Sequence, residues 1–247
     1  YKGLPLLSNQ GMIDITGKPL ASMAFMQVVW GLRKEPFIGV RPLNHAKEAP
    51  SKGSWQFTDA IDSWNWPGFE GTKAVIEVYA PGKRVRLLLN GRELGTKKLK
   101  NFKAVFRTPY APGTLTAEAL DDSGKTISTF SLSSGDGEIH LRVVPEKSVP
   151  KANGTDLCYL PIEFADGTGR LLPAIEQSVE VLAEGAVSLI GMGSALYKTN
   201  ESFLQNHYRA YRGRVLAVLK AEDKPGKAAV TIKSAGVEPV TIHLEVE

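Results

Sequence analysis

The stretch formed by residues 64–95, WNWPGFEGTKAVIEVYAPGKRVRLLLNGRELG, constrains the fold most strongly. Within it, residues 73–79 and 84–89 alternate apolar and polar side chains in steps of two, which is typical of a strand with one buried face. Asn90 and Gly91 follow directly, and both accept the positive φ of a tight primed turn. We therefore expect a β-hairpin here, with the chain folding back into a further strand.

The same pattern of short alternating segments between turn residues continues to the end of the chain. The first series is expected at 73–79, 84–89, 103–108, 114–121 and 125–132, with one or two more strands from 37–63. The second is expected at 138–145, 156–165, 177–183, 186–190, 213–221, 227–234 and 238–246. About seven strands is the number of an immunoglobulin-like sandwich. We predict a mainly β fold with two immunoglobulin-like β-sandwich domains in tandem.

Residues 1–35 differ from the rest because apolar side chains recur there at helical spacing. Thr16 is a candidate N-cap, and Gly31 is a candidate end of the helix. A single amphipathic helix has to pack against something. It either lies on the neighbouring sandwich, or its partners lie outside this chain, in which case Met23, Met26 and Trp30 are exposed in an apolar patch.

Small polar residues at 133–137, SSGDG, form the best linker in the chain. We therefore predict a division into residues 1–35, 36–136 and 137–247. A long segment, 191–212, interrupts the second strand series and either carries function or only wraps the sandwich.

Composition excludes several classes of protein. Apolar residues make up 43% and charged residues 23% of the 247, which is typical of a globular protein, and no apolar run is long enough to span a membrane. The formal charge of +4 is too small to indicate a nucleic-acid partner. The first residue is not Met, so we expect the chain to be part of a longer one. These features leave the compartment undetermined.

No catalytic constellation stands out. Asp121 and Asp122 suit a turn, and Glu77 is expected to be solvated. The four histidines have no metal-ligand spacing, so neither a metal site nor a cofactor is predicted. Cys158 alternates with apolar residues, which indicates a buried side chain rather than a nucleophile. The lysines of residues 97–103 form a short basic run, for which a solvated strand is the favoured interpretation.

Trp64 and Trp66 are the candidate substrate-binding residues. Indole rings can stack on the apolar face of a sugar, but two tryptophans can equally anchor a loop against a neighbouring domain. Both residues precede a Pro-Gly turn, so we expect two exposed indoles that dock on another part of a larger protein. Sugar contact and structural anchoring both remain open at this point.

The residues WNWPGFEG, IEVYAPGKRVRLLLNGRELG and APGTLTAEALDDSGK resemble the immunoglobulin-like domain that follows the barrel in bacterial β-galactosidase-type enzymes of glycoside hydrolase family 2. This chain has Ser63 where the family pattern has His. NQGMIDITGKPLASMAFMQVVWG resembles the end of the (β/α)8 barrel, including its last helix. ADGTGRLLP, GMGSA and NESFLQNHYRAYRGRVLAVLKA resemble a further C-terminal sandwich. The resemblance covers nearly the whole chain.

The resemblance implies a retaining hydrolase of terminal β-galactosides whose two catalytic glutamates lie on earlier barrel strands. No position here matches their motifs, so the resemblance implies no catalytic residue in this chain, which would be inactive alone. Its expected partners are the barrel and N-terminal domains of the parent chain. Two alternatives stay open, a carbohydrate-binding module that uses its tryptophans, including Trp55, and a bacterial surface protein of the adhesion or stalk type.

Overall fold

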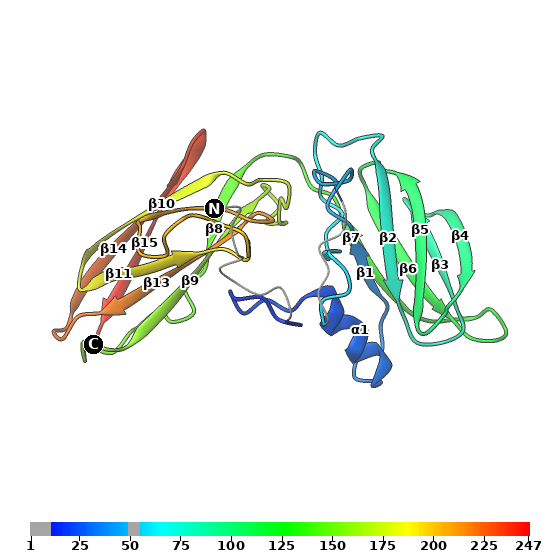
Figure 1. Ribbon diagram of the computed structural model, residues 1–247, viewed down its shortest axis with the longest axis horizontal. Helices are drawn as coiled ribbons and strands as arrows, with labels where there is room; N and C mark the ends of the chain where they lie inside the picture. Colours follow the sequence, from blue (N-terminus) through cyan, green and yellow to red (C-terminus); the bar gives the residue numbers. More distant parts are fainter. Residues whose placement is uncertain (1–10, 49–54) are drawn as a thin grey trace. The chain divides into compact units, whose positions relative to one another are not determined.

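The structure, a computed structural model, describes residues 11–48 and 55–247. It is mostly β, with antiparallel sheets and one helix among the described residues (Figure 1), as predicted. The chain divides into two compact units, 8–135 and 136–247. The helix and the first strand series fall within the same unit. The finer division between residues 35 and 36 stays a prediction.

The 8–135 unit is a sandwich of two sheets. Its strands are β1 (Phe37–Val40), β2 (Lys73–Tyr79), β3 (Arg84–Leu89), β4 (Arg92–Lys98), β5 (Lys103–Pro109), β6 (Thr114–Leu120) and β7 (Thr126–Ser133). One sheet has the order β1-β2-β5 and the other β4-β3-β6-β7. The five strands predicted between residues 73 and 132 are present, and the fold-back after Gly91 extends to Lys98 as β4.

Alternation along these strands places apolar side chains in the space between the two sheets. Ile76 of β2 lies opposite Val40 of β1 and Phe106 of β5, and all three are buried. The inward side chains of β3, such as Val85 and Leu87, are also buried. The period of two in the sequence therefore corresponds to a real division between inner and outer faces.

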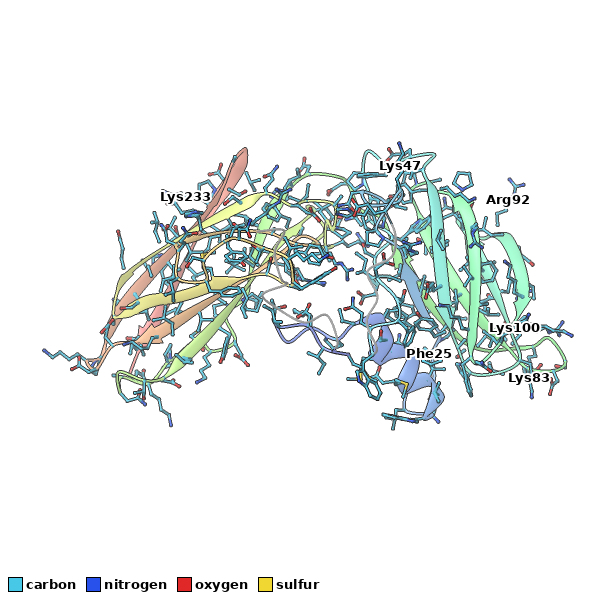
Figure 2. The ribbon with its side chains drawn as sticks, viewed as in Figure 1. Phe25, Lys47, Lys83, Arg92, Lys100 and Lys233 are labelled. Carbon is cyan, nitrogen blue, oxygen red and sulfur yellow. The ribbon has the colours of Figure 1, made fainter. Side chains whose placement is uncertain are left out.

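The helix α1 (Ala21–Val29) packs against the outer face of the β1-β2-β5 sheet. Ala21, Ala24 and Val28 form its buried side. Phe25, labelled in Figure 2, lies edge-on to Tyr79 of β2 with ring centroids 5.3 Å apart. The helix therefore lies on the neighbouring sandwich, which was the simpler of the two interpretations.

The structure corrects the predicted start of the helix and part of its predicted exposed face. Leu20, not Thr16, is the N-cap, and it makes no side-chain cap hydrogen bond. Thr16 lies instead in a tight turn, where its amide and hydroxyl both bond Asp14 Oδ1. At the other end Trp30 is 62% exposed, as expected for a side chain without a neighbour, whereas Met23 and Met26 are half-buried.

The 136–247 unit is a second sandwich, built from two four-stranded sheets. Its strands are β8 (His140–Val143), β9 (Leu157–Ala165), β10 (Ser178–Gly185), β11 (Val187–Gly193), β12 (His207–Arg209), β13 (Arg214–Ala221), β14 (Gly226–Ser234) and β15 (Val237–Val246). The sheet orders are β12-β10-β14-β15 and β11-β13-β9-β8. Seven of these strands match predicted segments, and β12 lies inside the stretch predicted as a loop.

The core of this unit follows the predicted rows. Cys158 and the alternating apolar residues after it on β9 are buried together, so the cysteine is a core side chain as expected. The long segment after β11 wraps the sandwich, since its Tyr208 is part of the buried core and its Phe203 packs against that core and stacks on Tyr208, with ring centroids 5.7 Å apart. Met192 N also donates to Phe203 O at 2.8 Å, which ties this segment to β11.

Candidate functional site

The segment around Trp64 and Trp66 is the site that the sequence singled out. Both indoles are 0% exposed, so the expectation of two exposed rings is wrong. The indoles are buried because Tyr110, which directly follows β5 in the same unit, packs against this segment. Trp64 lies edge-on to the Tyr110 ring with centroids 4.9 Å apart. The two indoles are therefore interior groups of the 8–135 sandwich.

Hydrogen bonds fix both indoles in this interior position. Trp64 Nε1 donates to Ala111 O at 3.1 Å, and Trp66 Nε1 donates to Ser63 O at 3.2 Å. The backbone N of Trp66 donates to the Tyr110 hydroxyl at 3.1 Å, and that hydroxyl lies 3.4 Å from Trp64 O. Each polar edge of the pair thus has a partner, as buried tryptophan requires.

Asn65, between the two tryptophans, extends this anchoring role. Its side chain is buried, and its Oδ1 accepts a hydrogen bond from Gly135 N at 3.0 Å. The segment therefore ties the start of the sandwich to the residues just after β7. Sugar binding by Trp64 and Trp66 stays a prediction, but neither residue offers an exposed ring face to support it.

A second polar cluster, missed by the sequence analysis, surrounds Glu77 on the outer face of β2. Glu77 is buried rather than solvated, because its Oε2 accepts hydrogen bonds from both Tyr79 Oη and Lys103 Nζ at 2.6 Å. Burial, together with the neighbouring Glu77 charge, holds the pKa of Tyr79 far above its ordinary value. The alternation of β2 could have shown that Glu77 and Tyr79 share a face, but not that Lys103 pairs with them.

Arg41 and Asp59 form a further ion pair in the same unit. Arg41 Nε and Nη2 donate to Asp59 Oδ1 and Oδ2 at 3.0 and 3.3 Å, a two-bonded arrangement. The Asp59 side chain is largely buried. This carboxylate is held by a cation rather than left free for proton transfer.

In the 136–247 unit the buried carboxylates are likewise engaged. Glu163 on β9 pairs with Arg142 on β8 and Arg214 on β13, the latter through Arg214 Nε at 3.0 Å. Asp166 closes its own turn by accepting from the backbone N of Thr168 and Arg170 at 2.8 and 3.0 Å. Both groups stabilise the folded chain.

Other candidate chemistry is also accounted for by the fold. Burial raises the pKa of the Cys158 thiol, whose Sγ lies 3.4 Å from Lys147 O, so thiolate chemistry is disfavoured. Within the described parts of the chain no group of three His, Cys, Asp or Glu side chains could hold a metal ion. Over those same residues, no helix is long and apolar enough to cross a membrane.

Comparison with known proteins finds matches for both units. Residues 141–243 match the family model "Glycoside hydrolase family 2 C-terminal domain 5", and residues 71–128 match a domain of unknown function, DUF4982. A crystal structure of a glycosyl hydrolase family 2 member from Bacteroides cellulosilyticus superposes with a TM-score of 0.83 at 28% identity, covering 96% of this chain and 32% of that one. The chain is similar to the C-terminal region of glycoside hydrolase family 2 enzymes.

The curated relatives of this chain are longer proteins. The chain is 29% identical over 190 residues to the β-galactosidase BoGH2A of Bacteroides ovatus, covering 74% of this chain and 22% of that protein. It is 25% identical over 199 residues to a β-glucuronidase of Formosa agariphila, covering 75% of this chain and 19% of that one. The chain thus spans about a fifth of the length of the curated relatives that it matches.

Proposed function

We propose that this chain is a non-catalytic structural part of a family 2 glycosidase, and that the parent hydrolyses terminal β-galactosides with retention. The two curated relatives differ in their sugar, so the choice of a galactoside follows the more similar of these two, BoGH2A. The catalytic glutamates would belong to a barrel outside this chain. The residues before α1 and α1 itself would be the end of that barrel.

The observation that supports a non-catalytic role is that the buried carboxylates are engaged in ion pairs or in a turn. A retaining glycosidase needs two carboxyl groups about 5–5.5 Å apart, one ionised and one able to give a proton. Here Asp59, Glu77 and Glu163 each pair with Arg or Lys in separate places, and Asp166 closes a turn. These buried carboxylates are therefore engaged in structural contacts at separate places and do not form a catalytic pair.

The alternative of a binding module through Trp64 and Trp66 loses its main support, since both rings are interior. Trp55 is 60% exposed, so a binding module that uses Trp55 in place of Trp64 and Trp66 stays an alternative. The adhesion alternative stays untested.

The test is to assay the purified chain on nitrophenyl β-galactoside and nitrophenyl β-glucuronide. We expect no turnover above buffer with either substrate. Turnover that co-purifies with the chain and disappears when one of its own carboxylates is replaced would contradict the proposal. A binding isotherm with neutral galactosides, lost in Trp55→Ala, would favour the binding module instead.

A further inference from the structure

The turn between β4 and β5 has an unusual residue at its second central position. Lys100 and Lys103 exchange backbone hydrogen bonds of 2.9 and 3.0 Å, so Asn101 and Phe102 are the central residues of a two-residue turn. Their φ angles are 48° and 63°, both left-handed. This is the primed turn whose usual sequence is Asn-Gly. Phe in a left-handed conformation is an outlier, because its Cβ crowds the following carbonyl oxygen.

The same unit contains a matched turn with the favoured sequence. Asn90 and Gly91, between β3 and β4, have φ angles of 52° and 77°. The chain thus uses Gly in one primed turn and Phe in the other. Phe102 is also 40% exposed, so burial does not account for its full ring. An exposed, strained aromatic side chain suggests a role outside the fold.

Three exposed lysines lie in or next to the Phe102 turn. Lys98, Lys100 and Lys83 are exposed, and no ion pair of theirs is found within the described residues. Lys83 lies next to the turn because its carbonyl accepts from Leu99 N at 2.9 Å, and Figure 2 shows Lys83 and Lys100 toward the same end of the unit. These lysines and Phe102 are termed the Phe102 patch.

Neighbouring charges leave the Phe102 patch positive. Lys97 Nζ donates a hydrogen bond to Val105 O and lies over the Phe106 ring, and Lys103 Nζ pairs with Glu77. These two lysines therefore already have partners within the unit. On the nearby turn, Asp121 Oδ1 accepts hydrogen bonds from Ser123 Oγ and Lys125 N at 2.7 and 2.9 Å. Asp122 is exposed there, as is Lys125.

A solvated strand edge explains part of this pattern, because edge lysines discourage pairing with other chains. It accounts for Lys98 on β4. It does not account for an aromatic ring in place of Gly at the turn, which costs stability and adds apolar surface. The ring points to a ligand with a flat apolar face, and the lysines point to a ligand with negative charge.

We propose that the Phe102 patch binds an acidic glycan, with the Phe102 ring against a sugar face and the lysine ammonium groups paired with carboxylate or sulfate groups. A glycan is favoured over nucleic acid because three lysines without ion pairs are too few to follow a phosphate backbone, and because the chain is similar to parts of glycosidases. The choice of a glycan rests on the proposed function, but binding by the isolated chain does not require hydrolysis.

The test measures binding of the purified chain by calorimetry. The probes are a short oligogalacturonate, a sulfated galactan fragment, a neutral galacto-oligosaccharide and oligothymidylate. We expect one or both acidic glycans to bind, with affinity that falls as salt rises, and the stronger of the two identifies the anionic group. Phe102→Gly and Lys100→Ser should each weaken binding about tenfold, as for one lost contact. The melting temperature of Phe102→Gly should stay level or rise.

Matched controls come from the other unit. Leu204 is 84% exposed and Lys233 is exposed, so Leu204→Ser and Lys233→Ser should leave binding unchanged. The proposal is overturned if no acidic glycan binds, if the neutral glycan or oligothymidylate binds as tightly, or if both patch variants bind like the unaltered chain. A failure here with no hydrolysis in the activity assay would leave the structural role standing, so the two proposals fail separately.

Discussion

Replacing Trp64 by Ala is expected to destabilise the 8–135 unit strongly. The fully buried indole contacts the Tyr110 ring and donates a hydrogen bond to Ala111 O. Trp-to-Ala changes in cores cost about 3–5 kcal/mol, to which the lost hydrogen bond adds about 1 kcal/mol, with partial overlap. We therefore expect a loss of about 4 kcal/mol. For a unit of about 130 residues this corresponds to a fall of roughly 12 °C in melting temperature.

The sequence supplies a selective assay for this change. All four tryptophans, Trp30, Trp55, Trp64 and Trp66, lie in the 8–135 unit, so intrinsic tryptophan fluorescence follows that unit alone. Thermal unfolding of the purified chain is recorded by emission wavelength. Far-ultraviolet circular dichroism then reports the 136–247 unit as well.

The matched control is Trp30→Ala, which removes the same side chain from a 62% exposed position. Its effect should stay within about 0.5 kcal/mol, as for ordinary surface substitutions. If Trp64→Ala melts within a degree or two of Trp30→Ala (roughly 0.5 kcal/mol), the anchoring role argued for the segment is refuted.

Three further outcomes are expected. Glu163→Gln should destabilise the 136–247 unit by about 3 kcal/mol in urea unfolding, since Arg142 and Arg214 lose their shared anion, whereas the exposed Glu245→Gln should have little effect. The pKa of Tyr79 is raised in the folded state, so its contribution to stability is present below the unfolded-state pKa of about 10 and is lost as the pH rises toward the folded-state pKa. Tyr79→Phe should therefore flatten the decline of stability at alkaline pH. An unchanged decline would contradict this. A chain of residues 138–247 should fold alone, as shown by dispersed amide resonances, because its core is self-contained; a collapsed spectrum would place the boundary elsewhere.

The sequence by itself determined the local elements of this protein. Alternation in steps of two is a property of neighbouring residues, so β2, β3 and β9 could be read directly, as could the primed turn at Asn90-Gly91. The row of buried side chains that includes Cys158 follows from the same period. These features depend on backbone geometry over a few residues, which is why they needed no knowledge of the fold.

Tertiary structure alone decided which side chains are interior and what they meet. Trp64 and Trp66 precede a Pro-Gly turn and were expected at the surface, but Tyr110 reaches them from more than 40 residues away. Glu77 is buried because Lys103, on the adjacent strand, neutralises it. The left-handed conformation of Phe102 is likewise a property of the folded backbone. Burial and ion pairing depend on contacts between distant segments, and a local pattern carries no information about those partners.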